Sequence, residues 1–225
     1  GSISAEQFGQ IIDFVQSTST ILSPSEYLHL AQQNLLQDNH TCLTFDDALR
    51  SQIKVAVPVL DSLNIQGFFF VYSSAFLGNP DPLEIYRYFR NNYYTDFEPF
   101  FTDFMSIAQQ QFGEQIQSSL QGFQPNTYLA NAPYYSDNER TFRFLRDNVF
   151  VNNQYDTIMN LLMSQRKFDP NDVMDELFMT TTDIQMLQQK GHEVGLHSAS
   201  HPTTMHKLDK RTQQTEYQTN YDFLK

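Results

Sequence analysis

An apolar run, Cys42 to Phe45, ends abruptly in two adjacent carboxylates, Asp46 and Asp47. A short apolar run of this kind is typical of a buried strand, so it predicts a strand that presents acid groups at the edge of a sheet. Two neighbouring carboxylates repel each other unless a shared proton or a positive charge relieves them, and a divalent cation would do so. The alternative is an ordinary helix start followed by a surface acid, because Asp is a good N-cap.

A second predicted strand, residues 191–196, runs directly into two histidines four residues apart, His197 and His201. Pro202 biases His201 away from helical conformation, so we expect the pair on a strand end and a tight loop. Imidazole nitrogens and carboxylate oxygens are ligands of zinc and similar divalent metals. One Asp with two His would leave coordination positions open for water and substrate.

Alternating helices and strands are predicted for the first 75 residues. Such alternation is typical of an α/β architecture with parallel strands and right-handed crossovers. The expected helices are 4–15, 23–35 and 53–63, and the expected strands are 42–45 and 67–72.

The segment from 76 to 180 is different, because it is rich in Phe, Tyr, Gln and Asn and its apolar residues recur at helical spacing. We interpret it as a mostly helical insertion with helices near 83–91, 97–111, 139–149 and 155–165. Its aromatic residues favour a small helical core. A lid or sugar-stacking platform and a partner-binding face are the alternatives.

Charge and composition exclude several classes of partner. The net charge of −12 argues against nucleic acid and anionic membrane surfaces, since both need basic patches, and it favours a neutral or cationic sugar over an anionic polymer. No apolar stretch approaches a membrane span. No signal peptide is visible, which favours a cytoplasmic location. However, Gly1-Ser2 is typical of a tag remnant, so the compartment stays unassigned. The one cysteine, Cys42, predicts a small core residue.

The Thr44-Phe45-Asp46-Asp47 segment, together with the segment from His197 to His201, resembles the first two motifs of the polysaccharide deacetylases, carbohydrate esterase family four. The resemblance implies a distorted, here partial, (β/α) barrel with an N-terminal part (1–75), the helical insertion (76–180) and a continuation (181–225). It also implies metal-dependent removal of an acetyl group from a sugar or surface glycan. Asp46 would be the general base. Asp47, His197 and His201 would hold a divalent metal, zinc first, with cobalt or nickel as alternatives.

Two departures from the family pattern leave other functions open. Ala48 stands where the family has glycine, and the family's later motifs, an Arg-containing loop and a late general-acid His, have no match in this chain. The alternatives are a catalytically incomplete barrel that binds carbohydrate or a partner, and a metal-dependent amidase or esterase acting on a small substrate. We expect His206 to be exposed in a loop rather than to be a further ligand. The exact substrate and the oligomeric state are not predicted.

Overall fold

A computed structural model describes residues 3–151, 153–202 and 204–225, so the expected tag remnant, Gly1-Ser2, lies outside the described residues. The chain divides into two compact units. The first contains Gly1–Asp81 and Val173–Lys225, and the second contains Pro82–Asp172. The sequence analysis placed these divisions after residues 75 and 180.

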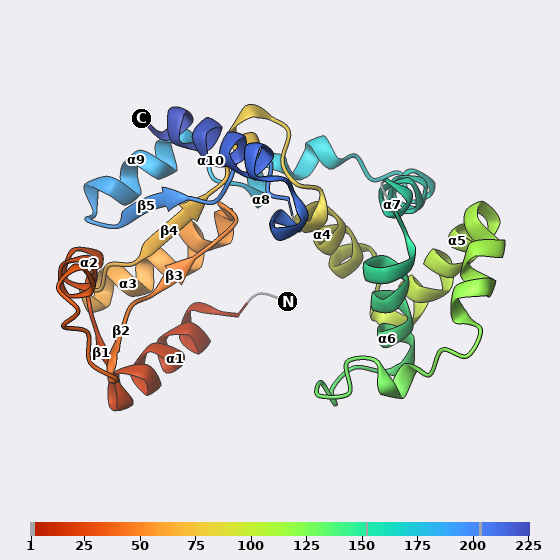
Figure 1. Cartoon of the computed structure of the whole chain (residues 1–225), viewed down its shortest axis with the longest axis horizontal. Helices are drawn as coiled ribbons and strands as arrows, with labels where there is room; N and C mark the ends of the chain where they lie inside the picture. Colours follow the sequence, from red (N-terminus) through yellow and green to blue (C-terminus); the bar gives the residue numbers. More distant parts are fainter. Residues whose placement is uncertain (1–2, 152, 203) are drawn as a thin grey trace. The chain divides into compact units, whose positions relative to one another are not determined.

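The barrel prediction is wrong, because the chain is mostly helical and its described strands form two small open parallel sheets (Figure 1). A barrel requires strands that close in a ring without edges, whereas each strand here has only two to four residues. Strands β1 (Thr20–Ile21) and β2 (His40–Thr41) pair in one sheet. The other sheet has the order β3-β4-β5, formed by β3 (Thr44–Phe45), β4 (Phe68–Val71) and β5 (Glu193–Leu196).

Helices make up most of the rest of the first unit, and several begin at a residue whose side chain caps the first turn. Capping boxes at Ser4, Ser23 and Thr180 start three of them, which satisfies amide donors that a helix start leaves without partners. Asp209 caps the helix that follows the histidine loop. The helices are α1 (Ala5–Thr18), α2 (Pro24–Gln32), η1 (Gln52–Ala56), α3 (Val57–Leu63), η2 (Ser73–Leu77), α8 (Met174–Leu177), α9 (Thr181–Gln189), η6 (Met205–Lys207) and α10 (Lys210–Leu224), with η5 (Pro170–Val173) at the division between the units.

The core of the first unit lies against the three-stranded sheet. Phe69 and Val71 of β4 pack in one cluster with apolar residues of α3 and α9, including Leu60 and Leu187, and all four side chains are almost fully buried. Phe70 of β4 pairs with Gly195 of β5. A Cβ atom at position 195 would lie 2.6 Å from ring carbons of Phe70. The glycine therefore lets the Phe70 ring lie directly over β5, and the strands keep their register.

The second unit is helical and has an aromatic core. Phe89, Phe100 and Phe104 are buried, and the Phe104 and Phe142 rings meet edge to face at 5.0 Å. This packing agrees with the helical-core interpretation of the aromatic residues. The helices are α4 (Leu83–Tyr93), α5 (Phe97–Leu120), η3 (Pro125–Thr127), α6 (Asp137–Phe144), η4 (Leu145–Val149) and α7 (Gln154–Gln165).

Among the described residues, no helix is both long enough and apolar enough to cross a membrane, in agreement with the prediction from the sequence.

Candidate metal centre

The three parallel strands of the larger sheet bring distant polar residues to one edge. Thr44, Phe68 and Glu193 stand at the same level across β3, β4 and β5. Because the strands are parallel, the segments that follow their carboxyl ends emerge side by side. Asp47 follows β3, and His197 follows β5 directly. The apolar strands that the sequence predicts at these places therefore deliver both the acid and the first histidine.

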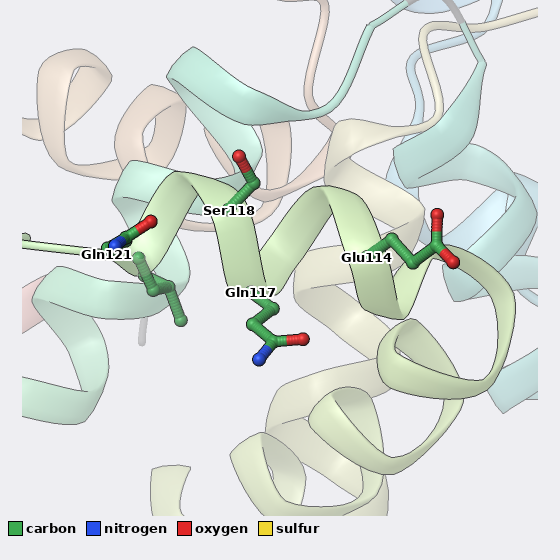
Figure 2. Close-up of a pocket in the computed structure, with 5 residues that line it drawn as sticks. Glu114, Gln117, Ser118 and Gln121 are labelled. Carbon is green, nitrogen blue, oxygen red and sulfur yellow. The ribbon is translucent and has the colours of Figure 1, made fainter.

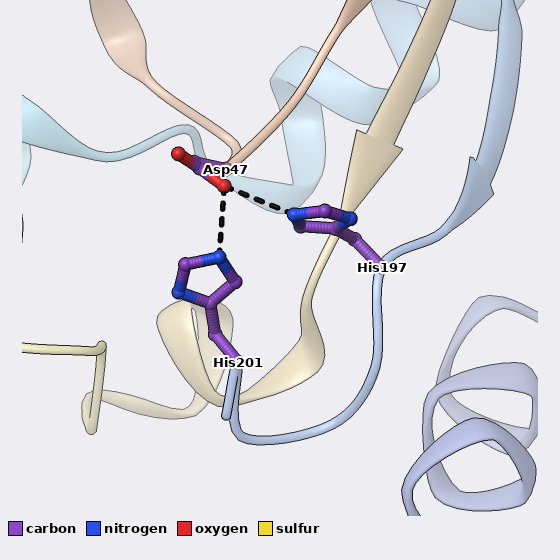
Figure 3. A group of neighbouring side chains, drawn as sticks. All are labelled: Asp47, His197 and His201. Carbon is purple, nitrogen blue, oxygen red and sulfur yellow. Dashed lines mark hydrogen bonds and ion pairs between the residues drawn. The ribbon is translucent and has the colours of Figure 1, made fainter. Parts of the chain in front are cut away.

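Asp47, His197 and His201 form a compact group (Figure 3). The Oδ1 atom of Asp47 lies 3.0 Å from Nε2 of His197 and 3.0 Å from Nε2 of His201. One potential ligand atom from each residue lies within 4.8 Å of the other two. All three side chains are partly buried, with 23% to 30% of each exposed, so the group is shielded but open to a small ligand.

Left-handed backbone aims these side chains at one another. Asp47 and Ala48 have φ of 74° and 54°, and Ser198 and His201 have φ of 74° and 57°. Such conformations are uncommon for residues other than glycine and cluster at functional sites. Ala48 is fully buried, and its carbonyl oxygen accepts a hydrogen bond of 2.8 Å from the Met179 amide. The hydrogen bond from Met179 therefore helps to hold the turn after β3 in its left-handed conformation.

Asp81 and Tyr72 are neighbours of the site that sequence reasoning did not identify. Oδ2 of Asp81 lies 3.0 Å from Nδ1 of His201, and the Tyr72 ring stacks on the His201 ring with centroids 5.0 Å apart. A carboxylate on the second nitrogen of a histidine orients the ring and fixes its tautomer in many metal sites. The available signal was weak: Tyr72 directly follows β4, and Asp81 lies in the Gly-Pro-rich break beyond it.

The two carboxylates perturb the protonation of the group. Hydrogen bonds from His197 and then His201 hold the pKa of Asp47 well below its usual range. Hydrogen bonds to Asp47 and then Asp81 raise the pKa of His201 to about 10. Both ring nitrogens of His201 face a carboxylate, so a metal ion that bound at Nε2 would have to displace a proton from that atom.

The three residues fit a divalent metal by the chemistry of their donor atoms. Two imidazole nitrogens and one carboxylate oxygen are ligands that zinc accepts, and three protein ligands leave a further position open, as in catalytic zinc sites. The carboxylate of Asp81 supplies the outer hydrogen bond that ligating histidines usually make. Asp47, His197 and His201 could thus hold a metal ion, as the sequence predicted.

The other residues considered in the sequence lie outside this group. Asp46 is exposed, its carboxylate has no hydrogen-bond partner among the described residues, and its carbonyl oxygen accepts a hydrogen bond from the Gln52 side chain. His206 is exposed in η6 and is not one of the clustered ligands. Cys42, expected in the core, is partly buried, and burial raises the pKa of its thiol.

Two hollows elsewhere lack such an arrangement. One, of about 610 Å³, is lined by residues from the carboxyl-terminal end of α5 (Figure 2), of which Glu114 alone is ionisable. The other, of about 160 Å³, is apolar and lies in the first unit between Phe8, Phe45 and Val55. Neither contains a member of the Asp-His-His group, which remains the candidate with the clearest chemistry.

Comparison of the chain with protein-family models, with curated proteins and with solved structures found no match.

Proposed function

We propose that this protein is a metal-dependent hydrolase that removes an acetyl group from an N-acetylated sugar or glycan. The observation that carries the proposal is the convergence of Asp47, His197 and His201 at one edge of a parallel sheet. The adjacent acid, Asp46, and the resemblance of both segments to deacetylase motifs give the site its proposed chemistry. We propose zinc as the metal, because its preferred ligands match the two nitrogens and one oxygen.

When bound, the metal would polarise an acyl carbonyl as a Lewis acid and lower the pKa of a water molecule. The chain's own residues would do the rest. Asp47, His197 and His201 would hold the ion, and Asp81, 3.0 Å from Nδ1 of His201, would fix the orientation of that ring. Asp46, with its carboxylate exposed and without a hydrogen-bond partner among the described residues, would accept the proton of the attacking water as general base and would return it to the amine nitrogen as the C–N bond breaks.

The proposal is tested by measuring bound zinc and acetate release from N-acetylglucosamine oligomers in the same preparations. We expect Asp47→Ala and His197→Ala to lose both zinc and activity, because each removes a ligand. Asp46→Asn should keep zinc and lose at least about 100-fold in activity, the scale of a general base. Asp38→Asn, which neutralises an exposed acid away from the site, is the control and should leave both measurements unchanged.

Other outcomes would redirect the assignment. Zinc that is lost in the two ligand variants, with no acetate release from oligomers of any length, would favour a binding function without catalysis. Activity on small acetylated amides or esters but not on sugars would favour the small-substrate amidase or esterase. Full activity of Asp46→Asn would remove Asp46 from the proposed mechanism.

A further inference from the structure

The loop between the two histidines needs support from outside itself. It spans residues 198–200 and includes Ser198, whose φ is 74°, while His201 at its end has φ of 57°. Within the loop, the Ser198 hydroxyl accepts one hydrogen bond of 3.1 Å from the His201 amide. Because left-handed conformations are uncommon for these residue types, surrounding groups must select this loop conformation from the others available.

Glu216 of α10 makes three hydrogen bonds to this loop. Its Oε2 atom accepts from the Ala199 amide at 2.9 Å and from the Ser200 amide at 2.8 Å. Its Oε1 atom accepts from the Ser200 hydroxyl at 2.7 Å. Hydrogen bonds to a carboxylate are stronger than those between neutral groups, so the Glu216 side chain fixes two of the three residues of the loop.

Asn220 supports the loop one helical turn later. Its Oδ1 atom accepts a hydrogen bond of 2.9 Å from the amide of His197, the first histidine, which also lies 3.1 Å from the Val71 carbonyl oxygen at the end of β4. The Asn220 side chain is fully buried. Positions four apart lie on the same face of a helix, so Glu216 and Asn220 together turn one face of α10 towards the backbone of 197–200.

Other side chains of α10 do not contact the histidine loop in this way. Tyr217 and Tyr221, the residues that follow Glu216 and Asn220, are each about half exposed, at 45% and 51%. Asp222 is exposed, and its carboxylate accepts a hydrogen bond from Gln218 of the same helix. Glu216 and Asn220 therefore form hydrogen bonds with the backbone around the histidines, whereas Asp222 forms one within its own helix.

We propose that Glu216 and Asn220 are positioning residues that preorganise His197 and His201 for the metal. The inference rests on the proposed metal site and deepens it. Neither residue supplies a ligand; each acts through the backbone that carries the histidines. Because the loop already has the conformation that binds the ion, no ordering of the loop is needed on binding. The affinity for the metal is higher for that reason.

The test is zinc affinity, measured by competition with a chromophoric chelator at pH 7.5, together with the visible spectrum of the cobalt-loaded protein. Glu216→Ala should weaken zinc binding about 10- to 100-fold, the usual effect of removing an outer-sphere partner, and alter the cobalt spectrum. Glu216→Gln should rescue both, because its amide oxygen can accept the two backbone N–H groups and its NH₂ can donate to the Ser200 hydroxyl. Asp222→Ala removes a negative charge from the same helix and should resemble the wild-type protein.

Thermal unfolding in chelator accompanies each variant. If Glu216→Ala does not fold, the Ser200→Ala variant tests the proposal instead. Ser200 is exposed, and its replacement removes one of the three hydrogen bonds to Glu216. Unaltered zinc affinity and an unaltered cobalt spectrum in this variant would overturn the proposal. A folded Glu216→Ala protein with wild-type affinity, or equal weakening by Asp222→Ala, would also overturn it while leaving the metal site intact. Absence of zinc binding by the wild-type protein would instead overturn the proposed function and this inference together.

Discussion

At the scale of single residues, His201 is the most constrained member of the site. The Asp47 carboxylate contacts Nε2 of its ring, and the Asp81 carboxylate contacts Nδ1. The Tyr72 ring stacks on one face of the imidazole. The ring can therefore neither turn over nor tilt without losing a contact. These contacts hold the His201 ring in one orientation, with its Nε2 atom directed at Asp47.

Asp81→Ala should weaken zinc binding about 10- to 100-fold, because the Nδ1 proton of His201 would lose its partner and the ring its preferred orientation. Isothermal titration with zinc measures this directly. Asp61→Ala is a suitable control, because Asp61 forms an exposed ion pair with Lys190 and should not affect the site. Equal affinity of the Asp81→Ala and wild-type proteins would show that the contact is incidental.

The sequence predicts the identity of the clustered residues but not the contacts around them. Asp46 does not join the group. Asp47 and the histidine pair follow apolar strands, so their meeting could be expected. Asp81 could not be, because it lies in an irregular loop whose path depends on tertiary packing. The conformation of Ala48 was not predictable either, because an alanine gives no sign in the sequence of the left-handed backbone that the structure has at that position.

At the scale of elements, local sequence signals locate helix starts well. Thr180 and Asp183 form a capping box at α9, and the Asp183 carboxylate accepts bonds of 2.7 Å from both the amide and the hydroxyl of Thr180. The same carboxylate forms an ion pair with Arg50, which follows the site-bearing turn after β3. The cap was predictable from spacing, whereas the link to Arg50 joins residues far apart in the chain.

Asp183→Ala should lower the free energy of unfolding by about 2–3 kcal/mol, because it removes a cap and leaves a partly buried Arg50 without its partner. Gln7→Ala, which removes the equivalent half of the capping box on exposed α1, is the matched control and should lose no more than about 1 kcal/mol. Urea denaturation of the metal-free proteins compares them. Similar losses in both variants would mean that the Arg50 contact contributes little.

At the scale of the whole molecule, the strands of the larger sheet were predicted but the barrel was not formed. The three predicted strands exist and lie parallel. The error came from extending them to a closed ring on the strength of a family resemblance. Most of the stretch between β4 and β5, from Pro82 to Asp172, carries its apolar residues at helical spacing, and these residues pack with one another in a separate unit rather than adding strands.

Phe104→Ala should destabilise the second unit by about 3–5 kcal/mol, since it empties a fully buried aromatic position. Zinc affinity should stay unchanged, because every residue of the metal centre belongs to the first unit. Hydrogen exchange would show faster exchange of amides within 82–172. Phe69→Ala, in β4 beneath the site, is the comparison and should reduce both stability and zinc affinity. A loss of zinc affinity in Phe104→Ala as large as that in Phe69→Ala would contradict the expectation.

The residues of the site lie far apart in the chain, because Asp47 and His197 are 150 positions apart. On a ribosome that adds roughly 5–20 residues per second, on the order of ten seconds separate the synthesis of the first ligand from that of the other two. The whole segment from Pro82 to Asp172 is synthesised in that interval. A metal ion could therefore contact all three residues only after the whole helical unit has been synthesised.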